Sequence, residues 1–171
     1  MRGIAPILTA LAIALVPAIA SAQTRSAAIF DFELVDTSNA EPLKAPDAEH
    51  QARMAQASER LRVRLAESGR FTVVDIAPVT KEAQAANLQS CGGCDVSLAE
   101  RIGADLSITG SVHKVSNLIL NMIIFVRDAK TGGNLAVAQA DMRGDTDESW
   151  LRTVDWLVRN RLLSPDHGVR Q

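Results

Sequence analysis

Hydrophobic and polar positions change their period several times along the chain, and each change marks a predicted element. Residues 27–34 alternate apolar with polar side chains, which predicts a strand with one buried face and with Asp31 and Glu33 on the other. From Asp47 the period becomes helical as far as Gly69, a residue free to adopt the positive φ that ends helices. The expected buried positions are Ala28, Phe30, Phe32 and Leu34 on the strand, and Met54, Ala57, Leu61 and Leu65 on the helix.

The middle of the chain mixes short elements with turns. Residues 36–46 are polar, hold two prolines and show no period, so they predict a surface loop. Residues 71–76 are rich in β-branched side chains and predict a second strand, and Pro78 suits the first turn of a short helix ending near Leu88. Asp95 is expected to cap a further helix from Val96 to Ile102.

The last third predicts three strands and a helix. Residues 105–113 alternate, whereas residues 118–126 are apolar on both faces except at Asn121, which predicts a central strand covered on each side. Residues 128–134 predict a hairpin connection, and residues 135–143 an antiparallel return. Asp145 and Glu148 stand at capping-box spacing before the last helix. Its apolar stripe comprises Trp150, Val154, Leu157, Val158 and Leu162.

These elements follow one another as β-α-β-α-α-β-β-β-α. The order predicts an α+β fold in which helices pack on one mixed sheet. Residues 23–164 have a length that one domain fills, so we expect a single domain followed by a disordered tail at residues 165–171.

Residues 1–22 have the features of a cleavable secretory signal. Arg2 is followed by an apolar run at residues 7–16, and Ala20-Ser21-Ala22 forms a small-x-small cleavage site. The run is too short to span a bilayer, and no later segment is apolar enough to insert stably in a membrane. No cysteine follows the cut directly, which gives no reason to expect a lipid anchor. The mature chain is therefore expected in the periplasm, with secretion from the cell left open.

Composition narrows the classes of partner. The formal net charge is −2 at pH 7, and loss of Arg2 with the signal makes it more negative. Nucleic-acid binding calls instead for a basic patch and a high pI. Tyrosine is absent and other aromatic residues are few, so platforms for base stacking and aromatic clefts for carbohydrate are poorly supplied. The core must be aliphatic.

Three segments resemble a known group of periplasmic domains. They are Leu-Ala-Glu-Ser-Gly-Arg-Phe-Thr-Val-Val-Asp at residues 65–75, Ile-Gly-Ala-Asp-Leu-Ser-Ile-Thr-Gly-Ser-Val at residues 102–112, and Val-Arg-Asp-Ala-Lys-Thr-Gly at residues 126–132. With the opening strand, they resemble the domain shared by the TolB N-terminal domain, CsgG, FlgT and LpoB. Within that group the chain is similar to an exported family of unknown function, which has a Cys-Gly-Gly-Cys elbow and an Asp-Thr-Asp-Glu-Ser-Trp segment. The resemblance implies a non-catalytic module that binds envelope proteins or assembles into rings of identical copies.

The pair Cys91 and Cys94 is the strongest candidate for chemistry. In an oxidising compartment such a pair is either a local structural disulfide or a redox-active site. Haem attachment would need histidine after the second cysteine, where Asp95 stands. The pair is expected to precede its helix and to lie beside an acidic residue, which favours the structural interpretation.

No metal, cofactor or catalytic site is predicted. His50, His113 and His167 are far apart in sequence and none has a second ligand at metal spacing. The acidic residues Asp141, Asp145, Asp147 and Glu148 surround a helix start, where carboxylates complement the helix dipole. No phosphate loop, nucleophile elbow or paired catalytic carboxylate is present, so the chain is not expected to be an enzyme.

A polar turn leads into the most apolar strand. Lys114, Ser116, Asn117 and Asn121 either form an interaction surface or serve local hydrogen bonds of the turn, and Asp145 and Asp147 are further candidates for that surface. Two function classes follow. One is an accessory or adaptor protein that binds an envelope protein, and the other is a small thiol-disulfide protein using Cys91 and Cys94.

Overall fold

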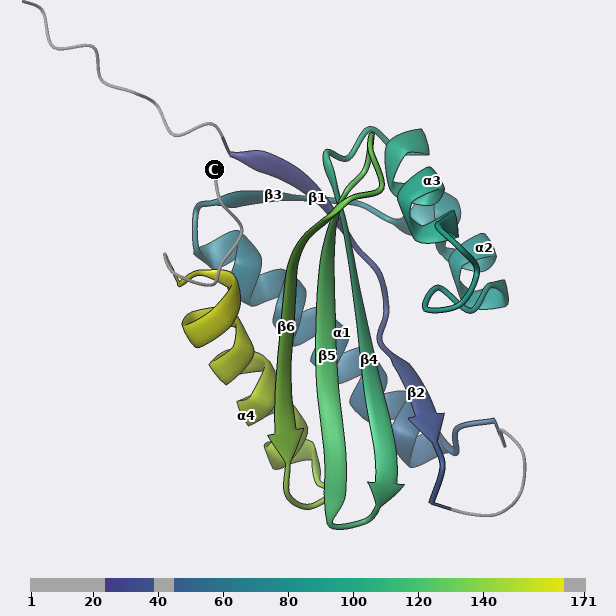
Figure 1. Ribbon diagram of the computed structural model, residues 1–171, viewed down its shortest axis with the longest axis vertical. Helices are drawn as coiled ribbons and strands as arrows, with labels where there is room; N and C mark the ends of the chain where they lie inside the picture. Colours follow the sequence, from purple (N-terminus) through teal and green to yellow (C-terminus); the bar gives the residue numbers. More distant parts are fainter. Residues whose placement is uncertain (1–23, 39–44, 165–171) are drawn as a thin grey trace, which may run out of the picture.

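A computed structural model describes residues 24–38 and 45–164 of the chain (Figure 1). The predicted signal at residues 1–22, part of the predicted surface loop and the predicted tail at residues 165–171 lie outside the described residues. Within the described ranges, no helix is both long and apolar enough to cross a membrane.

The order of elements agrees with the prediction, except that the first strand is divided in two. The strands are β1 (Arg25–Ile29), β2 (Glu33–Asp36), β3 (Phe71–Val74), β4 (Leu106–Ser116), β5 (Ile119–Asp128) and β6 (Asn134–Met142). The helices are α1 (Ala48–Glu67), α2 (Thr80–Ala85), α3 (Cys94–Arg101) and α4 (Asp147–Leu157), with short turns η1 (Ala77–Val79) before α2 and η2 (Val158–Leu162) after α4.

The described strands form one mixed sheet. Its order is β3-β1-β4-β5-β6, and β2 pairs with β4 beyond the end of β1. The β1–β3, β1–β4 and β2–β4 pairs are parallel, whereas β4, β5 and β6 are antiparallel. Helices α1 and α4 lie behind the sheet in Figure 1, while α2 and α3 lie beside its upper end. The predicted α+β fold is therefore confirmed.

The main core fills the space between the sheet and helices α1 and α4. Helix α1 begins as predicted, because Asp47 accepts a hydrogen bond from the His50 main-chain N–H at 2.9 Å. Ala57, Leu61 and Leu65 are fully buried along it, and Met54 packs partly buried at the margin. The predicted stripe of the last helix is also buried, from Trp150 to Leu162.

The prediction of one continuous first strand with Ala28, Phe30, Phe32 and Leu34 on a single face is wrong. Ala28 and Phe30 belong to a second apolar cluster under α2 and α3, whereas Phe32 and Leu34 face the main core. The main chain leaves the ladder between β1 and β2, where the Phe32 N–H donates to Ser58 Oγ at 2.9 Å. A side chain of α1 thus replaces the neighbouring strand as hydrogen-bond partner of the main chain. Beyond the break, the even-numbered side chains face the main core instead of the second cluster.

The expectation that residues 118–126 are covered on both sides is also wrong. The strand is central, but only Leu120, Met122, Ile124 and Val126 are buried. The alternate positions, Ile119 to Phe125, are partly or fully exposed on the opposite face. The reason is that α2 and α3 pack near β1 and the first part of β4 and leave most of β5 uncovered (Figure 1).

Three local predictions need correction. The helix after Pro78 is an η1–α2 pair that ends at Ala85 and not near Leu88. Helix α3 begins at Cys94, one residue before the expected capping residue Asp95. Asp95 does not cap the helix, and its buried carboxylate accepts hydrogen bonds from Ser107 Oγ and Arg127 Nη1, each at 2.8 Å. Before α4, the capping residue is Thr146, whose side chain accepts from the Ser149 N–H.

Candidate functional site

Asp145 is the centre of a buried cluster of charges at the lower end of the sheet. Its Oδ2 accepts a hydrogen bond from Lys114 Nζ at 2.7 Å and lies 2.8 Å from His50 Nε2. Its Oδ1 accepts from Arg53 Nη1 at 3.1 Å and from Trp150 Nε1 at 3.0 Å. Three separate elements, α1, β4 and α4, therefore meet at one carboxylate.

Burial and hydrogen bonding have opposite effects on this carboxylate. The side chains of Lys114 and Asp145 are each 7% exposed. Burial alone would raise the pKa of Asp145, but hydrogen bonds from Lys114, His50 and Trp150 outweigh it, so the pKa falls from 3.8 to about 2. Asp145 is therefore ionised throughout the neutral range.

Outer carboxylates complete the cluster toward solvent. His50 Nδ1 lies 2.8 Å from Asp47 Oδ1, and Arg53 Nε donates to Asp147 Oδ1 at 2.8 Å. Arg53 also pairs with Glu49 on the preceding turn of α1. Each buried cation thus has a carboxylate partner, which is the condition for keeping charges inside a protein. The arrangement connects α1 and β4 with the turn before α4.

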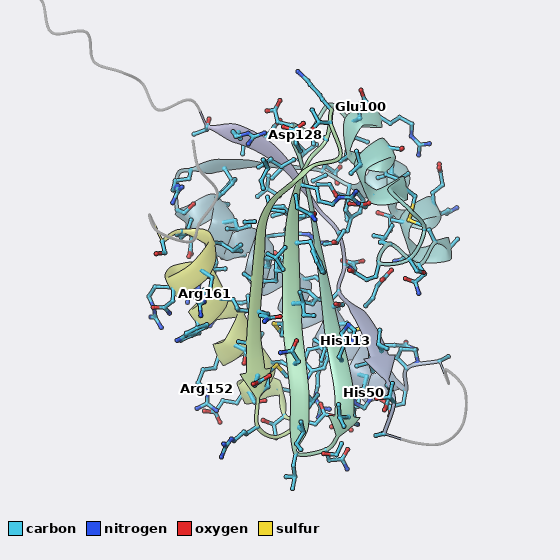
Figure 2. All side chains as sticks on the ribbon, in the orientation of Figure 1. His50, Glu100, His113, Asp128, Arg152 and Arg161 are labelled. Atoms are coloured by element: carbon cyan, nitrogen blue, oxygen red, sulfur yellow. A yellow bond between two sulfur atoms is a disulfide. The ribbon has the colours of Figure 1, made fainter. Side chains whose placement is uncertain are left out.

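The structure gives no group of three or more His, Cys, Asp or Glu side chains that could hold a metal ion within residues 24–38 and 45–164. Two of the histidines considered from sequence are described. Figure 2 shows His50 and His113 near the lower half of the sheet, where His50 belongs to the Asp145 cluster and His113 is exposed on β4.

The residues predicted to form an interaction surface divide into two groups. Lys114 and Asp145 are buried in the cluster, whereas Asp147 is exposed above it. Ser116 Oγ accepts from the Leu118 and Ile119 N–H groups, each at 3.2 Å, as expected of a local turn. The six residues lie at one end of the molecule but do not form one continuous set of exposed groups.

The hairpin tip, defined as residues 115–119 where β4 ends and β5 begins, is attached to the cluster. The Asp145 N–H donates to the Asn117 carbonyl at 3.1 Å, and the Gly144 N–H donates to the Leu118 carbonyl at 3.4 Å. Farther along β5, Asn121 Nδ2 donates to Asp141 Oδ1 at 2.9 Å on the uncovered face. The tip is therefore held by the same turn that carries Asp145.

Three apolar side chains project from this tip. Val115 is 58% exposed, Leu118 74% and Ile119 61%. The interaction surface predicted from sequence comprised polar residues and did not include these three. The sequence contains one signal for them, which is that all three apolar residues flank the polar pair Ser116-Asn117 of the predicted turn. Apolar side chains at a hairpin turn have no core to enter when the turn extends beyond the helices.

The disulfide elbow, defined as residues 88–94, lies beside α2 and α3. Cys91 and Cys94 are joined in a disulfide, with their Cα atoms 5.7 Å apart, and the bond between the sulfurs is visible at the upper right of Figure 2. Gly92 and Gly93 both have positive φ, which explains their place in the elbow. The Cys94 N–H donates to Cys91 Sγ at 3.3 Å. Cys94 is the first residue of α3, so the pair does not precede the helix as expected.

Solved structures confirm the predicted fold resemblance. The C-terminal domain of LpoB from Salmonella enterica matches with a TM-score of 0.50 at 18% identity, over 72% of this chain and 87% of that one. Lipoprotein GNA1162 from Neisseria meningitidis matches with a TM-score of 0.50 at 16% identity, over 80% of this chain and 96% of that one. At such identities the likeness shows the fold alone.

Sequence comparison places the chain in a family. No curated protein matches the sequence significantly. A family profile matches residues 25–162, a segment that runs from β1 to η2 and includes the Asp145 cluster, the hairpin tip and the disulfide elbow. The chain therefore belongs to the family described as "Protein of unknown function (DUF2380)".

Proposed function

We infer that the chain is a non-catalytic accessory or adaptor protein of the periplasm that binds an envelope protein through the hairpin tip. The observation that carries this proposal is the exposure of Val115, Leu118 and Ile119 on a tip that is hydrogen-bonded to a buried ionic cluster. Adjacent exposed apolar side chains of this kind mark interaction sites more often than single ones do. A partner with an apolar recess would bury them.

The cluster beneath the tip supports a binding role. Lys114 immediately precedes the tip, and its ammonium group forms an ion pair with the Asp145 carboxylate. The main-chain N–H of Asp145 donates to the Asn117 carbonyl within the tip. A surface fixed in this way loses little conformational entropy when a partner binds. By contrast, the paired charges offer no free base or nucleophile, which fits a binding protein better than an enzyme.

The proposed location follows from the signal features and not from the described residues. GNA1162, which shares the fold, is named as a lipoprotein, and an envelope setting for the present chain is consistent with that likeness. We expect cleavage after Ala22, so N-terminal sequencing of the protein from an envelope fraction should begin at Gln23. A start at Met1 in that fraction would contradict the export proposal.

The test of the interface compares two double variants. Leu118→Ser with Ile119→Ser removes the apolar tip, whereas Leu135→Ser with Val137→Ser removes exposed apolar side chains of β6. Cross-linking in envelope extract should yield a discrete partner with the wild-type chain and with the β6 variant, but not with the tip variant. All three should unfold at similar temperatures. Equal loss in both variants, or no loss in the tip variant, contradicts the proposal.

Assembly of identical copies is the other form of binding that the resemblance implies. Sedimentation of the purified mature chain distinguishes the two forms. A monomer that cross-links to a different envelope protein supports the adaptor role. A concentration-dependent ring or dimer that the tip variant abolishes would assign the hairpin tip to self-assembly.

A second candidate function, thiol-disulfide exchange, is favoured by one contact. The Cys94 N–H at the start of α3 donates to Cys91 Sγ, and donors at a helix N-terminus stabilise a thiolate once a disulfide is reduced. Asp95 does not oppose this, because its carboxylate is buried and paired with Arg127. In exchange, Cys91 and Cys94 would be reduced to thiols while two thiols of a partner are oxidised to a disulfide.

The double variant Cys91→Ser with Cys94→Ser separates the two functions. For an adaptor, we expect the variant to fold and to keep its partner, since the disulfide closes a very short loop and its loss costs little stability. The wild-type chain should neither reduce nor oxidise a model disulfide substrate. Exchange activity that is present in the wild type and lost in the variant would make the redox function the leading one.

A further inference from the structure

Strand β2 has one unpaired edge among the described residues. It pairs with β4 from Glu33 opposite Ser111 to Asp36 opposite Lys114. Strand β1, in contrast, has β4 on one side and β3 on the other, and β3 ends at Val74 before it reaches β2. Figure 1 shows β2 at the margin of the sheet, with no strand drawn beyond it.

The main chain of β2 is oriented so that this edge can form hydrogen bonds. The Thr37 N–H donates to the Lys114 carbonyl at 2.9 Å. Main-chain groups alternate in direction along a strand, so those of Glu33 and Val35 also face β4. The N–H and C=O groups of Leu34 and Asp36 therefore point to the unpaired edge. Such an edge is a template for an added strand.

A groove runs along the same edge. A cavity of about 330 Å³ lies between β2, α1 and α2, lined among others by Leu34, Met54 and Gln84. A second hollow of about 460 Å³ shares Asp31, Ile76 and Thr80 with it and continues beside β3. The two together, which we call the β2 groove, offer an extended path and not a compact ligand pocket.

The β2 groove combines apolar walls with acidic groups. Leu34 and Met54, which are partly exposed, provide apolar surface, and the largely buried Phe32 and Leu88 also line the groove. The charged lining residues are Asp31, Glu33, Glu59, Asp75 and Arg62, which gives four carboxylates against one guanidinium.

The single guanidinium of the groove is already engaged. Arg62 donates to Asp31 at 2.6 Å and to the Ile29 carbonyl at 3.0 Å. Within the described part of the chain, Glu33 accepts main-chain N–H groups from Leu88 at 2.7 Å and Gln89 at 3.3 Å, and burial raises its pKa above the ordinary value despite those bonds. Among the described residues, Asp31 and Glu59 share the guanidinium of Arg62, and Glu33 and Asp75 form no ion pair, so an incoming cation would meet carboxylates without a full countercharge.

We propose that the β2 groove binds an extended segment of a partner protein, in which Lys or Arg alternates with apolar residues, as a strand added beside β2. The Leu34 main chain pairs with the segment, the apolar walls take one set of its side chains, and the carboxylates take the basic set. The acidic lining and the net negative charge of the chain disfavour a second copy as the occupant. This proposal rests on the proposed adaptor function, because the segment is taken to belong to the envelope protein that the adaptor binds.

The proposal also gives the disulfide elbow a role. Leu88 both lines the groove and donates its N–H to Glu33, and Cys91 Sγ lies 3.7 Å from the Leu88 carbonyl. The disulfide between Cys91 and Cys94 thereby fixes the segment that closes one wall of the groove.

The test uses a fluorescein-labelled octapeptide of alternating Val and Lys/Arg, with a matched peptide that has Glu in place of each basic residue. Anisotropy titration of the mature chain should show saturable binding of the basic peptide only, weakening as salt is added. Hydrogen exchange of the Leu34 amide should slow when the peptide binds, because that amide gains a strand partner.

Two matched variants lie on helix α2. Gln84→Trp places a large side chain in the groove, whereas Lys81→Trp places the same side chain on α2 at an exposed position that does not line it. We expect Gln84→Trp to weaken peptide binding about tenfold or more and Lys81→Trp to change it less than about twofold. A further variant, Glu33→Gln with Asp75→Asn, should weaken binding and reduce its salt dependence.

Four results of these measurements would overturn the proposal, and a fifth concerns the free chain. The four are no saturable binding of the basic peptide, equal binding of the acidic one, equal effects of the two Trp variants, or an unchanged Leu34 exchange rate. A dimer of the free chain that Gln84→Trp dissociates would overturn it by assigning the groove to a second copy. Failure of the adaptor function is distinct. In that case the peptide still binds, but no envelope protein cross-links to the hairpin tip.

Discussion

Lys114 Nζ donates to Asp145 Oδ2 across 2.7 Å, and both side chains are almost completely buried. The two residues are far apart in sequence, one near the end of β4 and the other in the turn before α4. Their ion pair, together with the bond from Asp145 N–H to the Asn117 carbonyl, fixes the hairpin tip against the rest of the fold. The stability of this end of the molecule therefore depends on one carboxylate.

Replacement of that carboxylate should be far more costly than replacement of its exposed neighbour. Asp145→Asn removes the close countercharge of the buried Lys114 ammonium, whereas Arg53 keeps Asp147 and Glu49. We expect the free energy of unfolding to fall by about 3–5 kcal/mol. Asp147→Asn removes only a solvent-exposed partner of Arg53 and should cost at most about 1 kcal/mol. Urea unfolding of both variants measures the difference. Equal costs would show that the cluster does not carry the stability assigned to it.

Acid should weaken the fold through the same group. The pKa of Asp145 is about 2 in the folded chain, against 3.8 as its ordinary value. The unfolded chain takes up the proton first, so the contribution of Asp145 is complete above about pH 4 and is lost toward about pH 2. We expect the wild type to lose about 1–2 kcal/mol more than Asp145→Asn between these limits, after allowance for solvent screening. Parallel loss in both proteins would contradict this expectation.

Gly110 allows Phe32 to cross β4 at the break between β1 and β2. A Cβ at Gly110 would overlap the Phe32 ring, which is itself buried. Gly110→Ala should therefore destabilise the fold by about 1–3 kcal/mol, because the ring has to move within a packed core. Gly133→Ala is the control, since the nearest atom to its Cβ is Thr131 Oγ1 at 3.4 Å. Thermal unfolding that ranks the two variants in the reverse order would refute the close packing.

The two tryptophans of the last helix should differ sharply. Trp150 is 0% exposed, and Trp150→Ala should cost about 3–5 kcal/mol through lost burial and the cavity left behind. Trp156 is 40% exposed and lies beneath the Arg161 guanidinium at 5.5 Å, so Trp156→Ala should cost about 1 kcal/mol or less. Denaturant midpoints of both variants test this. A Trp150→Ala midpoint equal to that of the wild type would show that Trp150 is not packed between α4 and the sheet.

Local pattern was sufficient for most elements. Leu61 and Leu65 recur at helical spacing and are buried on α1, and the stripe from Trp150 to Leu162 is buried on α4 and η2. The Asp128 turn is also legible from the sequence, because its carboxylate accepts main-chain N–H groups from Lys130 and Thr131. In each case the residues that determine the element lie within a few positions of one another.

Contacts between distant segments were decided only by the tertiary structure. Ser58 and Arg62 of α1 satisfy main-chain groups at the break after β1, and no local period reveals that exchange. Asp95 pairs with Arg127 of β5 instead of capping its helix as expected. Asp145 serves as an ionic centre and not as a cap because Lys114 and Arg53 reach it from other elements. Sequence alone determined which segments are helices and strands, since this depends on nearby side chains, whereas burial of charge and the unpaired edge of β2 depend on which segments the folded chain brings together.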